Sequence, residues 1–213
     1  MLDIGGKKIA NSLAELVAPE RAALLLWDME YAIAPNAFNY NTILPNLKHL
    51  AALARRAGVP VFYSVQTPLD LAKEEPGVWV RVRMKRAKAT DPRQLLNETE
   101  DPKGREIVDE LKPQKEDFVF HKHRPDGFVG TDFDLVLRSK GVSTVIIGGV
   151  ATEGGVEGTA RSARNLGYDV VILRDGVGSR SRELHDMALK LMEQTFFDMA
   201  TTAEVLAIWE QKS

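Results

Sequence analysis

Short, continuously apolar runs alternate along this chain with longer segments in which apolar residues recur at helical spacing. The runs suit strands that are buried on both faces, and they lie at residues 22–27, 59–65, 117–121, 143–147 and 168–173. The segments with helical spacing lie at residues 39–57, 104–111, 132–139, 154–166 and 180–195. Residues 200–205 are expected to form a brief sixth strand before a helix that ends near Trp209. Such alternation predicts an α/β, Rossmann-like, doubly wound fold, with a mostly parallel six-stranded sheet and helices on both faces.

A long connection that is rich in proline and charged residues interrupts this alternation at residues 67–102. We expect it to be irregular, and a connection of this length is usually functional rather than part of the scaffold. No repeat or low-complexity tract divides the chain. The sequence therefore predicts one domain over residues 1–213, with a tail at each end.

Charge and hydropathy argue against nucleic acids and membranes as binding partners. The formal net charge of −2 argues against nucleic-acid binding, and the basic run RVRMKRAK at residues 81–88 is more typical of a solvated face. No stretch approaches the about 18 apolar residues that are needed to span a bilayer, and the first residues show no apolar core of a signal peptide. We expect a cytoplasmic protein with a small-molecule substrate and no nucleic-acid or membrane partner.

The chain contains no cysteine, so disulfides, thiolate metal sites and a cysteine nucleophile are excluded. The turn after the first predicted strand, Asp28-Met29-Glu30, has no glycine and lacks the dinucleotide-binding fingerprint. We therefore expect no nicotinamide or flavin cofactor, and no cofactor of another kind.

Candidate catalytic residues directly follow the predicted strands. In a parallel sheet the ligand crevice lies beyond the carboxyl ends of the strands. Asp28 follows the first strand, Gln66 follows the second, and Lys122 and His123 follow the third. The glycine-rich turn Gly149-Val-Ala-Thr-Glu-Gly-Gly155 follows the fourth. An acid, a cation and a turn are thus expected at one edge of the sheet.

Three motifs resemble those of the isochorismatase-like hydrolase superfamily. The run ALLLWDME around Asp28 resembles the family's LLVIDMQ, and FVFHKHRPDGF resembles its strand-three segment with a lysine. The stretch GGVATEGGVEGTARSARNLGY from Gly148 is similar to GVATNVCVESTARDAFDLGY. The motifs occur in the family's order, and the resemblance covers roughly residues 20–205.

The resemblance implies that Asp28 and Lys122 are catalytic and that the strand-four turn frames the substrate. It also implies a cis peptide bond between Val150 and Ala151, and a homo-oligomer. The histidines of the metal-binding branch are missing after the second strand, so we expect no metal. The run PGVWVRVR at residues 76–83 is the nearest counterpart of the isochorismatase WGPG run. The expected substrate-binding residues are Gln66, Trp79, Arg81, Arg83, His123, Val150, Ala151, Gly154 and Gly155, with the arginines holding a substrate carboxylate.

Gly155 stands where most relatives carry the cysteine nucleophile, so the covalent route is closed. True isochorismatases resemble this chain in having glycine there, and they act without a covalent intermediate. Their GVYAH run differs from GVATE here, so isochorismate itself is not the expected substrate. We expect a hydrolase for a small anionic or cyclic molecule, with catalysis by Asp28, Lys122 and Glu153. Gly154 and Gly155 are expected to make room for substrate or for a water activated by Glu153 or Asp28.

Other interpretations stay open at this point. Asp28 alone is compatible with a helix cap, His123 with a polar lining residue, and the glycines with a tight turn. The chain as a whole is compatible with a catalytically silent family member that serves as a small-molecule binding or scaffold protein. It is also compatible with a designed change of a cysteine to Gly155, although Glu153 and Gly154 depart from the usual ATNVC run as well.

Overall fold

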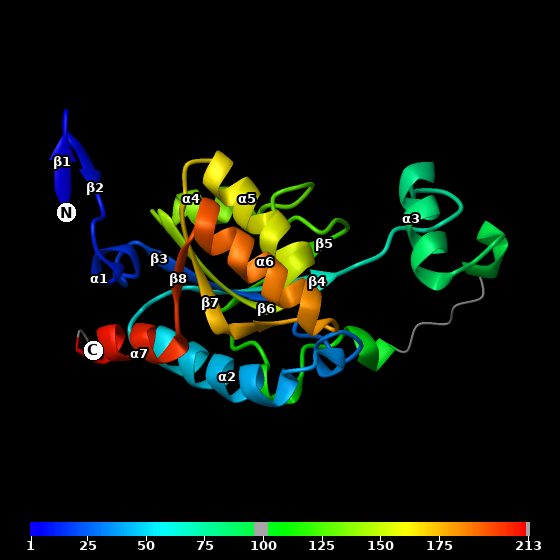
Figure 1. Ribbon diagram of the computed structural model, residues 1–213, viewed down its shortest axis with the longest axis horizontal. Coiled ribbons are helices and arrows are strands. Elements are labelled where there is room, and N and C mark those ends of the chain that lie inside the picture. The colour runs from blue at the N-terminus through cyan, green and yellow to red at the C-terminus, as the bar shows by residue number, and fades with distance from the viewer. Residues whose placement is uncertain (96–101, 212–213) are drawn as a thin grey trace.

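Six parallel strands form the central sheet, in the order β5-β4-β3-β6-β7-β8. The computed structural model, shown in Figure 1, describes residues 1–95 and 102–211. The strands are β3 (Ala22–Trp27), β4 (Val61–Gln66), β5 (Phe118–Lys122), β6 (Thr144–Val150), β7 (Asp169–Gly178) and β8 (Asp198–Ala200). The predicted fold class, with its six parallel strands, is confirmed.

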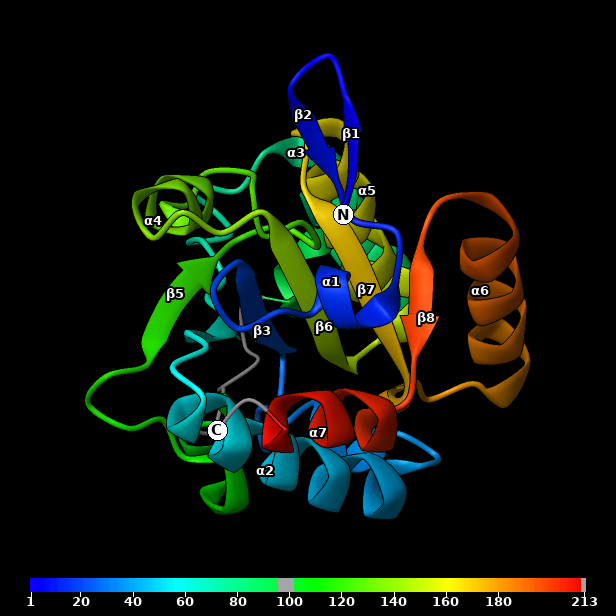
Figure 2. The same cartoon turned by 90° about the vertical axis from the view of Figure 1, so that its left-hand side faces the viewer.

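Helices cover both faces of this sheet, as Figures 1 and 2 show. Because β3 is apolar on both faces, Leu24 and Leu26 pack into one core while Leu25 and Trp27 pack into the other. The first core is covered by α2 (Tyr40–Arg56) and α7 (Thr202–Glu210). The second is covered by α4 (Phe133–Ser139), α5 (Glu157–Asn165) and α6 (Arg182–Thr195).

Two predicted elements differ in the structure. Residues 104–111 form no α-helix: only the short 3-10 turns Pro102–Arg105 and Asp109–Leu111 occur there. The backbone between them instead pairs with the chain after β3, because Tyr31 N donates to Glu106 O and Val108 N donates to Met29 O. The predicted strand at 200–205 was also wrong in its bounds, since β8 ends at Ala200 and Thr201 caps α7.

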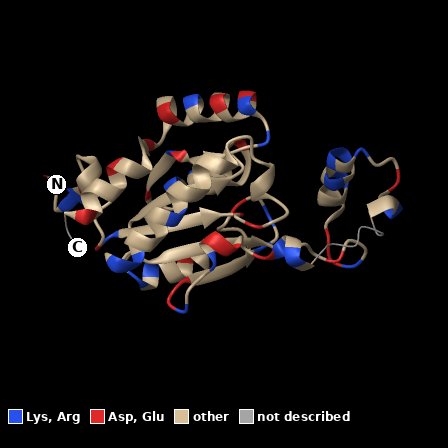
Figure 3. Cartoon of the chain, turned by 90° about the horizontal axis from the view of Figure 1, so that it is seen from below, with Lys and Arg blue, Asp and Glu red and all other residues tan. Residues whose placement is uncertain are grey.

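The connection after β4 is not wholly irregular. It contains α3 (Gly77–Ala87) and a 3-10 turn at Pro92–Leu95. Helix α3 has no buried residue and carries basic but no acidic side chains. It stands apart from the sheet, as Figure 3 shows, so residues 67–95 form an arm on the body of the protein.

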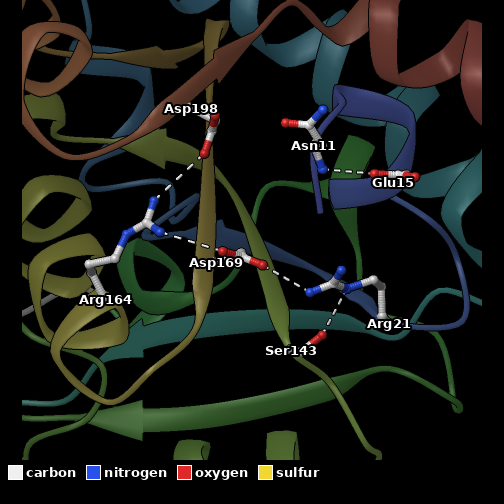
Figure 4. A network of polar contacts seen from close by, with 7 residues as sticks. All are labelled: Asn11, Glu15, Arg21, Ser143, Arg164, Asp169 and Asp198. Carbon is white, nitrogen blue, oxygen red and sulfur yellow. Dashed lines mark hydrogen bonds and ion pairs between the residues drawn. The ribbon is translucent and has the colours of Figure 1, made fainter. Parts of the chain in front are cut away.

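Charged residues connect the strands at the edge of the sheet where their amino ends lie. Figure 4 shows Asp169 at the start of β7, where its carboxylate pairs with Arg21 at 2.9 Å and with Arg164 of α5 at 3.5 Å. Arg164 also reaches Asp198 of β8 at 3.6 Å. These pairs fix the amino ends of the strands and leave the carboxyl ends for chemistry.

The chain ends lie near this edge as well. A hairpin of β1 (Leu2–Ile4) and β2 (Lys7–Ile9) is followed by α1 (Leu13–Leu16). Trp209 Nε1 donates to Val17 O at 2.7 Å and so connects α7 to the segment after α1. Among the described residues, no helix is both long and apolar enough to cross a membrane.

Candidate active site

Asp28 and Lys122 form a buried ion pair at the carboxyl edge of the sheet. Lys122 Nζ donates to Asp28 Oδ2 at 2.9 Å, and the side chain of Ser64 donates to Asp28 Oδ1 at 2.7 Å. Asp28 follows β3 and Lys122 ends β5, while Ser64 lies on β4 between them. The two charged residues are only 6% and 2% exposed. The structure therefore joins the acid and the cation that the sequence analysis singled out.

The environment of Asp28 favours its protonated form. Burial raises the pKa of Asp28 above its ordinary value, and this effect outweighs the lowering by the charge of Lys122 and the hydroxyl of Ser64. Its backbone adopts a φ of 47°, in the left-handed region that aspartate and asparagine tolerate best among residues with a side chain. A buried carboxyl with a raised pKa holds a proton more firmly than a free carboxyl does, which suits a general acid.

The position of the missing thiol is filled by an indole. A Cβ built on Gly155 would lie 2.1 Å from Trp27 Nε1 and 2.3 Å from its Cε2. The same indole lies beneath Lys122, with Nζ at 4.4 Å from the ring centroid. The expectation that Gly155 makes room for substrate or water is therefore wrong, because Trp27 takes that space. A designed cysteine-to-glycine change is also a poor explanation, since the matching cysteine would collide with Trp27.

Glu30 is a second buried carboxyl near the ion pair, and it was not among the predicted site residues. It is 1% exposed, and its Oε2 accepts a hydrogen bond from Gln66 N at 3.1 Å. The pKa of Glu30 is raised to about 7: burial is the main cause and the charge of Asp28 adds to it, while Gln66 N–H, Lys122 and Arg105 act in the opposite direction. The signal in the sequence was its place in the WDME run, where the family motif has glutamine.

The turn after β6 begins with a cis peptide bond between Val150 and Ala151, as the resemblance implied. Glu153 Oε1 accepts from Ser179 Oγ at 2.7 Å. Glu153 lines a hollow of about 450 Å³ between this turn and α6, and none of its described contacts joins it to Asp28 or Lys122. Gly154 has open space at its Cβ position. A catalytic role for Glu153 stays a prediction.

Basic side chains gather around the end of β4, and they come from the residue after β5, from the 3-10 turn Pro102–Arg105 and from α3. His123 Nδ1 contacts Thr67 O, and Arg105 donates to Gln66 O at 2.6 Å. Burial lowers the pKa of Arg105 and the charge of Glu30 opposes this, while Arg83 lies close enough to lower the pKa of Arg105 as well.

The other candidates on the arm, Trp79 and Arg81, lie nearer the start of α3 than Arg83 does. Trp79 stacks under Arg124, whose Cζ is 5.1 Å from the ring centroid, and Arg124 donates to His123 O at 2.7 Å. Arg81 is exposed on α3. The structure thus links Trp79 to His123 through Arg124, and it leaves Arg81 on the outer part of the arm. No group of three or more possible metal-ligating side chains occurs within residues 1–95 and 102–211.

Comparisons with known proteins show which proteins this chain is similar to. Residues 22–204 match the isochorismatase domain model. The ureidoacrylate amidohydrolase RutB of Pseudomonas savastanoi pv. phaseolicola is 30% identical over 202 residues, which cover 87% of this chain and 82% of that protein. The protein of the same name from Enterobacter sp. (strain 638) is 32% identical over 200 residues, 87% of each chain. A crystal structure of a cysteine hydrolase from Pseudomonas syringae pv. phaseolicola 1448A has a TM-score of 0.78 at 25% identity, covering 93% of this chain and 96% of that chain.

Proposed function

Because this chain belongs to the isochorismatase-like hydrolases and has no cysteine, we propose that it hydrolyses a small anionic or cyclic molecule by acid–base catalysis without a covalent intermediate. The observation that carries the proposal is the buried Asp28–Lys122 pair, with Trp27 in the space of the thiol. A side chain that could attack a carbonyl from position 155 is absent. Water is therefore the nucleophile.

Asp28 supplies a proton to the atom that leaves the substrate. As the scissile bond breaks, the bonding electron pair goes to the leaving nitrogen or oxygen, which takes the proton of Asp28. Lys122 then balances the negative charge that appears on the Asp28 carboxylate, at a distance of 2.9 Å. The oxygen of a water molecule forms the new bond to the carbon, and its proton passes to a base.

Amides of small acids are the first substrates to test. Two relatives carry the name ureidoacrylate amidohydrolase, which describes a substrate with both an amide-type bond and a carboxylate. Arg83, Arg105 and His123 supply basic groups beside the site. We propose that these residues bind the substrate carboxylate, and that Gln66, Trp79, Arg81 and the turn from Val150 to Gly154 complete the binding surface.

Replacing Asp28 with asparagine tests this function. Turnover of ureido acids, cyclic and linear amides, vinyl ethers and lactones is measured for the parent protein and for Asp28→Asn. We expect turnover of at least one class, and about a hundredfold loss or more in the variant, because the acid is removed while the backbone conformation suits asparagine. Asp134→Asn is the control, since Asp134 lies on α4 in a surface pair with Arg138. Equal turnover by the parent protein and Asp28→Asn would contradict the proposal.

A second candidate function follows from the burial of the Asp28–Lys122 pair. Asp28 and Lys122 are almost wholly buried, and Trp27 fills the space of the thiol. A catalytically silent protein that binds a small molecule would have such a centre. Tight binding of a panel compound without turnover would favour this function over hydrolysis.

We also propose that the chain forms a homo-oligomer through α6. Leu184, Met187 and Leu191 form an apolar stripe on this helix and are 48%, 61% and 47% exposed. Glu183 and Lys190 are seven positions apart, which places them on the same side of the helix beside the stripe. When two copies of α6 pack antiparallel, Glu183 of each copy faces Lys190 of the other, so the charges on the helix suit a second copy.

The oligomer is tested with Met187→Glu. We expect the parent protein to sediment as a dimer or larger assembly, and the variant to shift toward the monomer because it places a charge in the apolar stripe. Leu135→Glu is the matched control, because Leu135 is 71% exposed on α4, on another part of the surface. A monomeric parent, or a variant with the mass of the parent, would contradict this interface.

A further inference from the structure

We propose that Glu30 is the base that takes the proton from the attacking water, so that the centre uses two carboxyl groups with opposite tasks. The inference rests on the proposed function and adds a catalytic residue to it. It starts from three differences between this chain and the family motifs, which are Trp27, Glu30 and Gly155. Gly155 has no nucleophilic side chain, and Trp27 fills the space that one would occupy. Glu30 adds an acidic group beside the same ion pair.

The position of Glu30 is fixed by its own backbone and by β4. Its carbonyl oxygen accepts from Ile33 N at 3.0 Å and from Ala34 N at 2.9 Å. The residue also pairs with Ile107 in an isolated antiparallel bridge. Its side chain is held by Gln66 N, at the end of the strand that lies between Asp28 and Lys122. Glu30 is therefore preorganised at the carboxyl edge of the sheet.

The two carboxylates among the predicted catalytic residues, Asp28 and Glu153, are placed differently from Glu30. Both oxygens of Asp28 accept hydrogen bonds, one from Ser64 and one from Lys122. Glu153 accepts from Ser179 on Oε1 and its Oε2 is buried without a partner in the described part of the chain, but it lies toward α6 and has no described contact with the ion pair. Among the contacts of the described residues, the side chain of Glu30 accepts one hydrogen bond, on Oε2. Its Oε1 therefore keeps lone pairs with which to bind a water molecule.

Charged groups from several elements act on Glu30. Asp28 lies two residues earlier in the chain, Lys122 ends β5, and Arg105 ends a 3-10 turn, with Arg83 of α3 acting on Arg105 in turn. Together with burial they place the pKa of Glu30 at about 7. A base with such a pKa is partly free of its proton at neutral pH and still binds one with useful strength.

The proton transfers balance with these two residues. Water gives a proton to Glu30 while its oxygen bonds to the substrate carbon, and the π pair of the carbonyl moves onto the carbonyl oxygen. When that pair returns, the bond to the leaving atom breaks, and the leaving atom takes the proton of Asp28. Glu30 then returns a proton to Asp28 through solvent, and both residues regain their starting states.

The variant Glu30→Gln tests the inference, because it keeps the shape of the side chain and an oxygen to accept from Gln66 N. We expect the parent kcat to rise with pH through about 7, since Glu30 must lose its proton to act as a base. In Glu30→Gln we expect kcat to fall about a hundredfold above that pH, without the rising limb and with an unchanged KM. A direct readout is the ¹³C signal of the Glu30 carboxyl, which should titrate near neutral pH in the parent and be absent in the variant.

The outcomes separate the inference from the function on which it rests. Glu106→Gln, at an exposed glutamate nearby, should retain the parent activity and pH profile. Activity that is lost in Asp28→Asn but retained in Glu30→Gln would overturn the role of Glu30 and leave the proposed function standing. The absence of a glutamate carboxyl signal that titrates near neutral pH would likewise overturn the role of Glu30 and leave the proposed function standing. A parent protein without turnover would overturn both proposals.

Discussion

Replacing Gly155 with cysteine is expected to destabilise the fold by about 3 kcal/mol and to produce no amidase activity. The new Cβ would lie 2.1 Å from Trp27 Nε1, and both residues are buried, so the indole has to leave its position beneath Lys122. Such overpacking forces side chains away from their preferred rotamers. The free energy of unfolding, from urea denaturation followed by circular dichroism, measures the effect.

Two further variants show whether Trp27 is the cause. Gly154→Cys adds the same side chain one residue earlier, where the nearest atom to the new Cβ is 3.9 Å away. We expect Gly154→Cys to lower the free energy of unfolding much less than Gly155→Cys does. In a Trp27→Ile background, Gly155→Cys should be milder than in the parent, with a coupling free energy of about 1 kcal/mol or more between the two positions. A Gly155→Cys protein as stable as the parent would show that the indole does not fill this space.

Replacing Lys122 with methionine is expected to lower the free energy of unfolding at neutral pH by about 4 kcal/mol. The side chain of Lys122 is almost wholly buried and donates to Asp28 at 2.9 Å. Methionine has a similar length but no charge, so Asp28 is left buried without a cation. The contact of the ammonium with Trp27 is lost as well. We also expect no turnover above the level of Asp28→Asn.

The loss of unfolding free energy in Lys122→Met should grow as pH rises. Burial already raises the pKa of Asp28 above 3.8, and Lys122 opposes this rise. Without Lys122, the folded state holds the Asp28 proton more firmly than the unfolded chain does. A group whose pKa is higher in the folded state contributes stability at low pH and loses that contribution as pH rises through the unfolded and then the folded pKa. The variant should therefore be closest to the parent at acidic pH and furthest from it above neutral pH.

Controls separate the buried charge from the loss of a lysine. Lys140→Met changes an exposed lysine at the end of α4 and should alter stability little. The double variant Asp28→Asn/Lys122→Met removes both charges and should recover part of the stability that Lys122→Met loses. A Lys122→Met protein whose deficit is the same at all pH values would contradict an unpaired Asp28.

Much of the fold could be predicted because its strands are apolar on both faces. The runs that became β3, β4, β6 and β7 were recognised from this property, and the alternation with helices gave the parallel sheet. The segment at 104–111 shows where local pattern is insufficient. Its spacing suits a helix, but the backbone of Glu106 and Val108 bonds to the chain after β3 instead. Helix α3 was missed because it has no buried face to produce a pattern.

The candidate site was predictable where a residue directly follows a strand. Asp28 and Lys122 were selected for this reason and from the resemblance, and the structure joins them. The role of Trp27 was not predictable, because it depends on how β3 and β6 align: Trp27 pairs with Gly149, and this brings the indole against Gly155. Glu30 was missed because a glutamate after a strand usually lies in solvent, whereas the pairing with residues 106–108 buries it here.

The strand order has a consequence for how firmly the two partners are held together. Lys122 belongs to β5, which lies at one end of the sheet and pairs only with β4, whereas Asp28 follows β3 in the interior. An edge strand can detach while the rest of the sheet stays folded, at a smaller free-energy cost than global unfolding. Each such opening separates Lys122 from Asp28, which is 94 residues away in the chain. The protection of the β5 amides against hydrogen exchange therefore sets an upper limit on the fraction of molecules whose acid and cation are in contact.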